Sequence, residues 1–600
     1  MARNEPATRV ASAGDAVRVE RLTVRHRKGA RPALDGVSFV VPRGVIAGVV
    51  GPDGAGKTTL LRCLAGLTLQ TSGEVAILGL RWTEHRSALQ QRVAYMPQTG
   101  NVYDNLTVRE NLELFAELYG VPLAEKRARL EQLLEASNLA AFQRRLARAL
   151  SGGMRQKLGL ICCLVSEPDL LVLDEPGVGV DVVSRRELWN IYRDRAAAGT
   201  TVLLSTTYMD EADECDYVIV LDEGRLVYAA PPDEFRARAG GRVAVCHASQ
   251  LPPRHLAARL ADTPGLLDAI VEGDQVRVLL TDELARLRSS LAQVCPHVDQ
   301  AAPRFSDAFV LAIGAKSTSE STTRLPAFIQ ERRAPSHEDH QEMVVVERVT
   351  KQFGRFVAVR EVSFRAYRGE VFGLLGANGA GKTTLFRMLC GVLQPTRGRL
   401  LVAGADATRA PIALRQRIGY MAQRFALYRE LTVAENISFY GRAYNVDGRA
   451  LNRRIEQLLD SLGLRPLART RSDELPLGFK QRLSLACAIV HDPEIVFLDE
   501  PTSGVDPLAR REFWRLMNAL AALGRTVLVT THFMEEAEYC DRVVIMEAGR
   551  VIAQGSPAEI LGRAWAIDST ARTFEDAFVI LLQQHRVRQD SGSAPDHPRL

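Results

Sequence analysis

A glycine-rich segment of the type that binds phosphate occurs twice in this sequence. GPDGAGKTT (Gly51–Thr59) and GANGAGKTT (Gly376–Thr384) both fit the pattern GxxxxGK[ST]. Glycines allow consecutive backbone N–H groups to surround a phosphate, and the N-terminus of a following helix adds its positive dipole end. The lysine of this pattern reaches the β- and γ-phosphates of a nucleotide, and the hydroxyl after it coordinates Mg²⁺. The two segments therefore predict two sites for a magnesium–nucleotide complex.

The elements around these segments agree with that chemistry. The apolar runs VIAGVV and VFGLL indicate buried strands before them, and TLLRCLAG and TLFRMLCG indicate helices after them. The candidate phosphate-binding residues are Gly51, Gly54, Gly56, Lys57, Thr58 and Thr59 in the first segment and Gly376, Asn378, Gly379, Gly381, Lys382, Thr383 and Thr384 in the second. The hydroxyls of Thr58 and Thr383 are also candidate metal ligands.

A pair of carboxylates follows an apolar run downstream of each segment, in LLVLDEP and IVFLDEP. Asp174 and Asp499 suit the coordination sphere of the metal ion. Glu175 and Glu500 suit a general base that orients an attacking water. Two carboxylate pairs, each downstream of a phosphate-binding segment, predict phosphoryl transfer to water.

The two sets of motifs belong to an internal duplication. The second copy follows the first at a constant offset of 325 residues from the glycine-rich segment to Cys215 and Cys540. The closing segments RFSDAFVLAI and TFEDAFVILL match at an offset of only 269, so the first copy carries 56 extra residues. These residues lie near 240–300, where two short strands and two amphipathic helices are expected.

Further motifs carry a family resemblance. LSGGMRQKL (Leu150–Leu158) resembles the signature of ABC-type ATPases. Gln98 in YMPQ and Gln423 in YMAQ resemble the Q-loop of that family, and GVGVD and SGVDP resemble its D-loop. His532 in THFMEEAE is similar to its switch histidine. On these motifs the chain is identified as a member of the ABC-type ATPases.

The resemblance implies a role for each matched residue. ATP and Mg²⁺ are the implied cofactors, and the implied catalytic residues are Gln98, Glu175, Gln423, Glu500 and His532. Two modules of this family pair head to tail, so that the signature residues Ser151, Gly152 and Gly153 complete the nucleotide site of the other module. Phe353 takes the upstream position expected to stack on adenine.

The two copies depart from the family pattern in different places. The first copy has Thr207 where the second has His532, and the second copy has Pro476-Leu477 where the first has Ser151-Gly152. Proline cannot donate a backbone N–H, and leucine adds bulk where a γ-phosphate must approach closely. At the adenine position, His26 stands for Phe353 in a looser alignment.

Both main departures fall in one composite site, because the first phosphate loop faces the second signature. That site keeps Lys57, Thr58, Asp174 and Glu175, and it is predicted to bind nucleotide and turn it over slowly or not at all. The complete site, predicted to hydrolyse ATP, joins Lys382, Thr383, Gln423, Asp499, Glu500 and His532 with Ser151–Gly153. The alternative is that both differences are tolerated and both sites hydrolyse ATP.

Composition excludes several functions. The chain has 600 residues and is 46% hydrophobic and 24% charged, as expected of several globular domains. No stretch reaches the roughly 18 apolar residues of a membrane span, so the chain is not expected to form a transport pathway alone. The N-terminus lacks the apolar core of a secretory signal, and the nine cysteines show no CxxC pair. A reducing cytoplasm fits best.

The predicted fold class is α/β, with two P-loop NTPase (ABC-type) nucleotide-binding domains in tandem. Each has antiparallel β and helical subdomains, and a small α/β appendage follows the first. The expected boundaries are a disordered N-terminus over 1–15, ATPase domain 1 over 16–239, the appendage over 240–313, a flexible linker over 314–341, ATPase domain 2 over 342–586 and a disordered tail over 587–600. The helical subdomains are expected over 101–150 and 426–475.

The motifs YMDEAD and FMEEAE and the closing FSDAF and FEDAF segments resemble ATPases that drive ABC-2-type exporters. A tandem of such modules most resembles the fused ATP-binding subunit of bacterial multidrug-type exporters. The resemblance implies integral membrane permease subunits as partners, with the chain cytoplasmic and peripherally bound to the inner face of the cell membrane. The segments after Gln98 and Gln423 would touch the permease.

Two other classes of tandem ABC protein stay open. Sugar-type importers also pair a working site with a degenerate one, although the appendage and closing helices fit them poorly. Soluble translation-type proteins act on ribosomes and carry a basic linker suited to RNA phosphates. Residues 241–340 hold 11 basic and 12 acidic residues, and the net charge of the chain is +5, so no nucleic-acid partner is expected.

Overall fold

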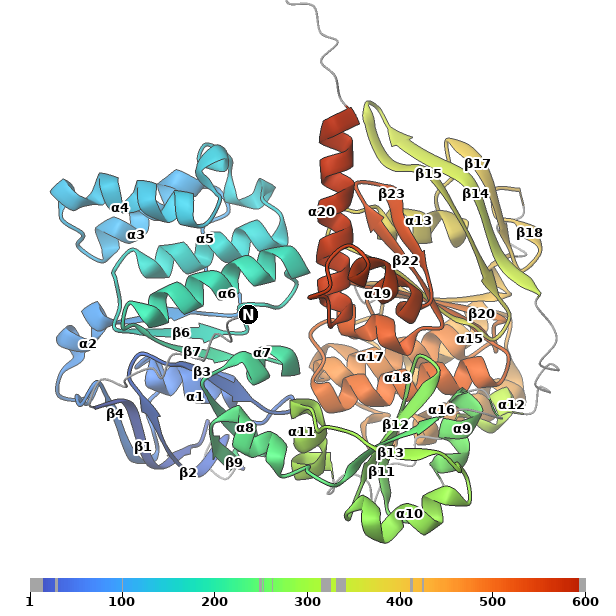
Figure 1. Ribbon diagram of the computed structural model, residues 1–600, viewed down its shortest axis with the longest axis horizontal. Helices are drawn as coiled ribbons and strands as arrows, with labels where there is room; N and C mark the ends of the chain where they lie inside the picture. Colours follow the sequence, from blue (N-terminus) through green and yellow to red (C-terminus); the bar gives the residue numbers. More distant parts are fainter. Residues whose placement is uncertain are drawn as a thin grey trace, which may run out of the picture. The chain divides into compact units, whose positions relative to one another are not determined.

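The chain forms two compact units in a computed structural model that describes residues 14–26, 31–99, 101–247, 251, 253–261, 263–314, 325–330, 341–409, 414–423 and 426–592. Unit 1 consists of Met1–Ala239 and Pro303–Ile313, and unit 2 of Gly240–Ala302 and Gly314–Leu600. The chain therefore passes between the units three times. The expected α/β class with two repeated modules in tandem is confirmed (Figure 1).

Unit 1 is built on a six-stranded sheet in the order β5-β6-β7-β3-β8-β9. Its strands are β3 (Ile46–Val50), β5 (Val93–Met96), β6 (Leu170–Asp174), β7 (Thr201–Ser205), β8 (Tyr217–Asp222) and β9 (Arg225–Ala230). The pairs among the first five strands are parallel, and only β9 runs antiparallel to its neighbour. The central strands are apolar on both faces, as a parallel sheet covered on both sides requires.

An antiparallel sheet and a set of helices complete unit 1. The sheet has the order β2-β1-β4, with β1 (Asp15–Val24), β2 (Leu34–Pro42) and β4 (Ser72–Ile77). The helices are α1 (Lys57–Leu64), α2 (Arg86–Arg92), α3 (Val108–Leu118), α4 (Leu123–Ala136), α5 (Gly152–Leu164), α6 (Val182–Ala197), α7 (Met209–Glu214), α8 (Pro232–Ala237) and α11 (Phe305–Ile313). The segment between β5 and α5 is helical, as expected for 101–150.

Unit 2 repeats this architecture. Its main sheet has the order β19-β20-β21-β16-β22-β23, and its antiparallel sheet the order β15-β14-β17-β18. The strands are β14 (Glu342–Phe353), β15 (Phe356–Tyr367), β16 (Val371–Gly376), β17 (Arg397–Val402), β18 (Ala405–Asp406), β19 (Ile418–Met421), β20 (Ile495–Asp499), β21 (Thr526–Thr531), β22 (Arg542–Glu547) and β23 (Arg550–Gly555). The helices are α13 (Lys382–Leu389), α15 (Val433–Ala443), α16 (Gly448–Ser461), α17 (Leu477–Ile489), α18 (Pro507–Ala522), α19 (Pro557–Trp565) and α20 (Phe574–Gly592), with the 3₁₀ segment η6 (Met534–Tyr539) after β21.

Residues 240–302 form a small subdomain of unit 2, which we call the arm. Its antiparallel sheet has the order β11-β12-β10-β13, with β10 (Val243–His247), β11 (Leu266–Glu272), β12 (Gln275–Leu280) and β13 (Val298–Gln300). Helices α9 (Pro253–Leu260) and α10 (Leu284–Ala292) cover it. The arm has its own core around Leu256, Val278 and Leu291. The sequence indicated β10, β12 and both helices but not β11 and β13.

The expected appendage of 240–313 is divided between the units. Its last segment, α11, packs against α7 and α8 in unit 1. The ring of Phe305 lies 5.0 Å from that of Phe235, and Phe309 is fully buried. These apolar side chains tie the end of the first repeat to its own module.

Two expectations about unstructured segments need correction. The linker expected over 314–341 contains α12 (Ala327–Gln330), where Ile329 is buried and the guanidinium of Arg454 lies 4.8 Å from the ring of Phe328. Apolar residues in an otherwise polar segment explain this short helix. The tail expected over 587–600 is helical as far as Gly592, where α20 ends. An ion pair between Arg586 and Glu547 holds this helix just before the expected tail. Residues 1–13, 315–324, 331–340 and 593–600 lie outside the described parts of the chain.

Within the described ranges, no helix has both the length and the apolar character needed to cross a membrane.

Candidate functional site

Each phosphate-binding segment connects the central strand of its sheet to a helix. The first lies between β3 and α1, and the second between β16 and α13. The ammonium group of Lys57 donates to the carbonyl oxygens of Gly51 (2.8 Å) and Pro52 (3.1 Å). Lys382 makes the same contacts with Gly376 (2.6 Å) and Ala377 (3.1 Å). Each lysine is thus held against the loop whose backbone would bind phosphate.

One glycine in each loop is required by geometry. Gly56 and Gly381 cap the helices α1 and α13 with φ of 100°, in the left-handed region. A Cβ atom on Gly56 would lie 2.6 Å from the carbonyl oxygen of Ala33, and one on Gly381 would lie 2.5 Å from that of Ala358. No other residue fits without a backbone shift, which explains why glycine stands before the lysine in both copies.

The carboxylate pair of unit 1 lies directly beyond β6. Asp174 accepts hydrogen bonds from Thr58 Oγ1 (3.2 Å), Ser205 Oγ (2.8 Å) and Tyr95 Oη (3.3 Å). Gln98 Nε2 donates to Glu175 Oε2 at 2.6 Å. The predicted residues Gln98, Thr58, Asp174 and Glu175 therefore meet at the end of the phosphate loop.

The corresponding pair in unit 2 has a different set of partners. Asp499 Oδ1 accepts from Thr530 Oγ1 (2.6 Å) and Thr383 Oγ1 (3.4 Å). Gln423 Nε2 donates to Glu500 Oε2 at 2.9 Å, and Nδ1 of the buried His532 lies 3.3 Å from the same oxygen. Neither ring nitrogen of His532 has a hydrogen-bond partner of good geometry among the residues that the structure describes, so its contact with Glu500 is a close approach of imidazole to carboxylate.

The switch position of unit 1 makes no such contact. Thr207 is 1% exposed, and its hydroxyl has no hydrogen-bond partner in the described parts of the chain. Glu175 is therefore held by Gln98, whereas Glu500 is held by Gln423 and His532 together.

This difference moves the pKa values of the two glutamates in opposite directions. Burial is the main cause that raises the pKa of Glu175, and the charges of Asp174 and Asp53 add to it, so Lys57 and Gln98 do not offset the rise. Burial also raises the pKa of Glu500, but His532, Lys382 and Gln423 more than offset it and lower the pKa to about 2. The ionised form of Glu500 is thus strongly favoured, whereas the ionised form of Glu175 is favoured less.

Both glutamates have a strained backbone. Glu175 and Glu500 each have φ of 50°, a left-handed conformation that side-chain-bearing residues rarely adopt. The N–H of each donates to the hydroxyl at the end of the neighbouring strand, Ser205 (2.8 Å) or Thr530 (2.9 Å). Strain of this kind persists where the surroundings fix a functional side chain.

The residues of unit 2 fit a magnesium ion bound together with a nucleotide. Asp499 is 1% exposed, and its Oδ2 atom has no hydrogen-bond partner among the described residues. An orphaned carboxylate oxygen beside the hydroxyl of Thr383 is the oxygen donor set that Mg²⁺ accepts. No cluster of three or more His, Cys, Asp or Glu side chains suited to a metal was found in the described ranges. The protein would therefore supply two ligands, and phosphate and water oxygens the others.

The two signature segments start their helices differently. Ser151 caps α5, and its hydroxyl accepts from the N–H of Met154 at 3.3 Å. Pro476 caps α17 without a side-chain hydrogen bond, and Leu477 begins the helix. A Cβ atom on Gly504 would lie 3.1 Å from Leu477 Cδ2, so this leucine packs against the D-loop of its own module.

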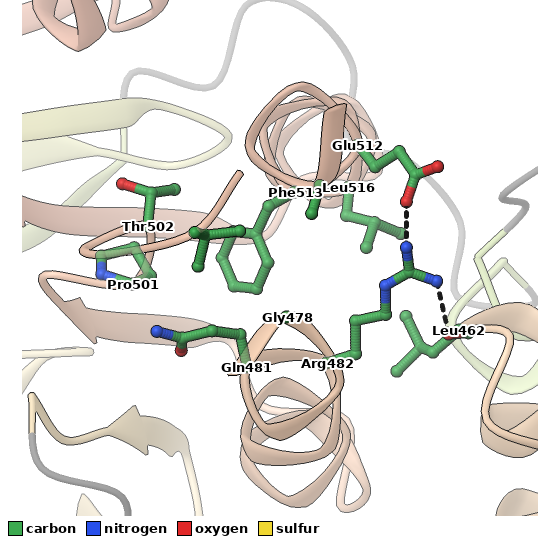
Figure 2. A pocket seen from close by; sticks show the side chains of 11 residues that line it. Leu462, Gly478, Gln481, Arg482, Pro501, Thr502, Glu512, Phe513 and Leu516 are labelled. Carbon is green, nitrogen blue, oxygen red and sulfur yellow. Dashed lines mark hydrogen bonds and ion pairs between the residues drawn. The ribbon is translucent and has the colours of Figure 1, made fainter. Parts of the chain in front are cut away.

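The second signature helix is also anchored to the helix that follows the D-loop. Figure 2 shows Arg482 of α17 reaching Glu512 of α18 and the carbonyl oxygen of Leu462. In unit 1 Lys157 pairs with Glu187 at 2.6 Å in the same way. The second signature therefore keeps its supporting contacts although its first two residues depart from the family pattern.

The adenine position remains a prediction. Phe353 ends β14 and is 48% exposed, with the ammonium of Lys351 5.0 Å from the ring centroid. In unit 1 Nε2 of His26 lies 3.4 Å from the hydroxyl of Thr59. An exposed aromatic ring is free to stack on a base, whereas the imidazole of His26 is engaged with the loop.

Sequence reasoning missed three residues of the sites. Ser205 and Thr530 join the metal-site aspartate to the backbone of the following glutamate, and Tyr95 donates to Asp174. A signal was available for the first two, because a hydroxyl residue stands 31 positions after the aspartate in both copies. The role of Tyr95 was not recognised, although a tyrosine also stands at the equivalent position, Tyr420. Both tyrosines interact with an arginine as well, Arg62 and Arg387 respectively.

Comparison with known proteins gives the family of this chain. The profile of the family described as "ABC transporter" matches residues 34–178 and 359–503, which hold both phosphate loops and both carboxylate pairs. A probable multidrug ABC transporter ATP-binding protein of Escherichia coli, YbhF, is 44% identical over 554 residues, which cover 92% of this chain and 95% of that protein. The chain belongs to the ABC transporter ATP-binding proteins. Its two ABC transporter domains imply ATP binding and ATPase activity.

Other relatives match one or both modules. The Nod factor export ATP-binding protein I of Rhizobium leguminosarum bv. viciae is 44% identical over 214 residues, 36% of this chain and 69% of that protein. Among solved structures, an RNase-L inhibitor is 21% identical with a TM-score of 0.58 and covers 91% of this chain and 93% of its own. At that identity the second likeness shows the fold alone.

Proposed function

We propose that this chain is the energy-coupling ATPase of a membrane exporter with permease subunits of the ABC-2 type, bound peripherally to the inner face of the cell membrane. Relatives named for multidrug transport and for Nod factor export support the export direction. Within the chain, hydrolysis is assigned to the second nucleotide site, completed by the signature Ser151–Gly153 of the first module. The first site, facing Pro476-Leu477, holds nucleotide with little turnover.

The contact between His532 and Glu500 carries this assignment. Nδ1 of His532 lies 3.3 Å from Glu500 Oε2, and Gln423 donates to the same oxygen. At the equivalent place in unit 1, Thr207 is too short to reach Glu175 and makes no hydrogen bond within the described ranges. Since a base must be ionised and oriented to accept a proton from water, the second site is the better equipped.

Each residue of the second site then has a definite task. Bound ATP and Mg²⁺ supply the transferable phosphate and the positive charge that polarises it. Lys382 and the loop N–H groups would bind phosphate oxygens, while Thr383 and Asp499 would hold the metal. Glu500, kept ionised by His532 and Gln423, accepts a hydrogen bond from the attacking water. His532 Nε2 has no partner in the described ranges and would contact a phosphate oxygen.

A surface of aromatic residues after each Q-loop supports docking of the permease. In unit 2 the rings of Tyr428 and Phe439 lie 4.4 Å apart, and these residues are 48% and 42% exposed. The buried Asn436 fixes this loop through its side chain, which accepts from the N–H of Tyr428 (3.0 Å) and donates to its carbonyl oxygen (3.1 Å). An exposed aromatic patch on a rigid support is typical of protein interfaces.

Unit 1 has a related arrangement, in which Tyr103 corresponds to Tyr428, but Phe115 corresponds to Tyr440 and Leu114 takes the place of Phe439. Tyr103 is 55% exposed, lies 6.5 Å from the ring of Phe115, and is held by Asn111 through the same pair of hydrogen bonds. The chain would thus offer one docking surface per module, as an exporter with two permease halves requires.

Isolation of this chain from native membranes in mild detergent tests the function. Polytopic membrane proteins at stoichiometric levels are expected with it. Ribosomal particles, with no membrane protein, would overturn the exporter assignment and favour the translation-type alternative. The double variant Tyr428→Ala/Phe439→Ala should lose the permease while keeping basal ATPase activity. Trp565→Ala is a matched control, because Trp565 is 60% exposed elsewhere in unit 2.

A further inference from the structure

We propose that the arm (residues 240–302) positions the catalytic elements of the second module, and that Asp268 and Arg254 are its two positioning residues. This inference rests on the proposed function, because it assigns the arm to the site that hydrolyses ATP.

The first contact is a buried ion cluster. Asp268 of β11 has a side chain that is 1% exposed, and it accepts hydrogen bonds from Arg511 (2.8 Å) and Arg515 (2.9 and 2.6 Å) of α18. Burial raises the pKa of Asp268, but the two guanidinium groups outweigh it and the net shift is downward. A fully buried carboxylate with two arginine partners is a fixed docking point. Removal of the carboxylate or of the arginines would leave a buried charge without its partner.

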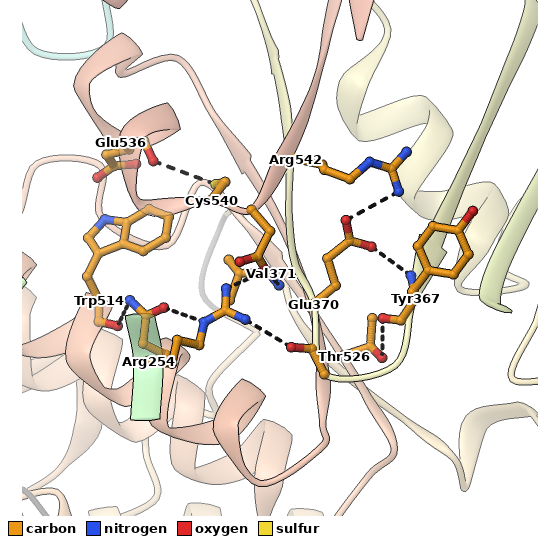
Figure 3. Close-up of polar contacts among 12 residues, drawn as sticks. Arg254, Tyr367, Glu370, Val371, Trp514, Thr526, Glu536, Cys540 and Arg542 are labelled. Carbon is orange, nitrogen blue, oxygen red and sulfur yellow. Dashed lines mark hydrogen bonds and ion pairs between the residues drawn. The ribbon is translucent and has the colours of Figure 1, made fainter. Parts of the chain in front are cut away.

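The second contact reaches three segments of the module. Arg254 of α9 donates to Asn518 Oδ1 of α18 (2.8 Å) and to the carbonyl oxygen of Gly369 (2.9 Å), and it pairs with Asp541 (Figure 3). The same Asp541 oxygen accepts from the N–H of Val371 at 2.8 Å. Val371 begins β16, the strand that leads into the phosphate loop. Arg254 is therefore connected to the start of that strand through Asp541.

The third contact joins the arm to the segment after the switch histidine. The N–H of Gly273, in the turn between β11 and β12, donates to the carbonyl oxygen of Glu538 in η6 at 3.2 Å. The arm thus touches α18, the start of β16 and η6. These are the elements that follow the D-loop, precede the phosphate loop and follow His532.

A path of contacts within unit 2 runs from the arm to the catalytic base. Arg510, next to Arg511 on α18, has its guanidinium 4.4 Å from the centroid of the Phe533 ring. That ring is stacked on His532 with centroids 4.3 Å apart, and His532 contacts Glu500. At the N-terminus of α18, Asp506 of the D-loop caps the N–H groups of Leu508 and Ala509. A shift of α18 therefore moves both the D-loop and the support of His532.

The docking surface is specific to the second module. At the offset of 325, Arg515 and Asn518 correspond to Asn190 and Arg193. The first module therefore lacks the second arginine for Asp268 and has a positive charge where Arg254 needs an acceptor. The arm follows the first module in sequence but fits only the second, which is the module with the complete switch.

The substitution Asp268→Asn in the full-length chain tests the proposal. The maximal ATPase rate (kcat) should fall about tenfold, because small displacements of catalytic groups slow the chemical step strongly. KM for ATP should stay within about twofold, since nucleotide binding depends on Lys382 and its loop. Asp282→Asn is the matched control, because Asp282 pairs with Arg286 inside the arm at 2.8 Å. Asp268→Glu should restore part of the rate.

Hydrogen exchange gives a readout that does not depend on activity. Amide exchange over 503–510 and 532–540 should be faster in Asp268→Asn than in the Asp282→Asn control. An unchanged kcat, unchanged exchange in both segments, or a rise in KM that accounts for the whole loss of activity would each overturn the proposal. If Asp268→Asn does not fold, Arg254→Gln carries the same test, because it leaves the buried ion cluster intact.

Failure of the proposed function would look different. In that case Glu500→Gln would retain most of the ATP turnover, and this result would mean that hydrolysis does not depend on the second nucleotide site. The exchange experiment would still report whether the arm holds α18 and η6 in place.

Discussion

The Nδ1 atom of His532 lies 3.3 Å from the Oε2 atom of Glu500, and this contact distinguishes the two nucleotide sites of the chain. The imidazole, with Gln423 and Lys382, holds the carboxylate in its ionised form. In unit 1 the side chain at the same place is Thr207, and among the described residues Gln98 and the charge of Lys57 favour the ionised form of Glu175. The two sites therefore have equivalent phosphate loops but unequal catalytic bases.

The first prediction compares the two bases. Glu500→Gln should lower ATP turnover by at least about 100-fold, because it removes the proton acceptor of the complete site. Glu175→Gln should change turnover by less than about twofold, because the first site contributes little to hydrolysis. Steady-state phosphate release by the full-length chain measures both, and comparable losses would refute the asymmetry.

The second prediction makes the second site resemble the first. In His532→Thr, burial of Glu500 would no longer be offset by the imidazole, so its pKa should rise toward the behaviour of Glu175. The acid limb of the pH–rate profile should then move to higher pH, and kcat should fall by about ten- to 100-fold. Thr207→Ala is the control, and it should leave the profile unchanged. An unmoved acid limb in His532→Thr would contradict the role given to the imidazole.

Much of this arrangement was predictable from the sequence, because the chemistry depends on short motifs at fixed places along strands. The loops, the carboxylate pairs and the glutamines came together in both units as their motifs implied. The pairing of Gln423 with Glu500 follows from two neighbouring parallel strands, β19 and β20, that end at the same edge of the sheet.

Contacts between distant parts of the chain were not predictable in this way. Asp268 and its partners Arg511 and Arg515 are separated by more than 240 residues, and nothing local in β11 distinguishes this aspartate from a solvated one. The helix over 327–330 depends on contacts of Phe328 with Arg454 and of Ile329 with Arg525, more than 100 residues away in the chain, which a polar linker composition does not indicate. Tertiary packing decided these features against the local pattern.

The third prediction concerns pH and stability. Glu370 is buried, and burial raises its pKa to about 7 even though the N–H of Tyr367 and the guanidinium of Arg542 favour its charge. Below its ordinary pKa of 4.5 the carboxyl is protonated in both the folded and the unfolded chain. As the pH rises through 7, the folded chain must ionise a buried group, so stability present at low pH is lost. The loss should reach about 3 kcal/mol.

The variant Glu370→Gln isolates this effect. Its amide keeps a neutral group at the site at every pH, so the thermal unfolding of unit 2 should depend less on pH between 5 and 8 than in the unaltered chain. Calorimetry over that range measures the difference. Parallel pH dependences of the two proteins would show that Glu370 is not the titrating group.

The fourth prediction tests the geometry of the phosphate loop. Gly381→Ala should abolish ATP binding to unit 2 and lower its stability, because the new Cβ would lie 2.5 Å from the carbonyl oxygen of Ala358. Gly404→Ala is the matched control, since Gly404 also has positive φ (75°) but has no atom within 4 Å of the new Cβ. The control should cost only the strain of a left-handed alanine, about 1 kcal/mol. Equal losses in the two variants would mean that strain alone, and not the close approach of Ala358, requires glycine.

The last prediction attempts to repair the degenerate site. Thr207→His restores a partner for Glu175, and Pro476→Ser with Leu477→Gly restores a backbone donor and removes bulk at the second signature. The three changes are made in the Glu500→Gln background, where the second site is silent, so any gain in turnover comes from the first. Turnover at least about tenfold above that of Glu500→Gln alone is expected, because the loop, the metal-site aspartate and Gln98 are already in place.

Glu175→Gln added to the repaired chain should abolish the gain, since it removes the base that the repair recruits. Turnover that stays at the level of Glu500→Gln alone would show that Thr207 and Pro476-Leu477 are not what limits the first site.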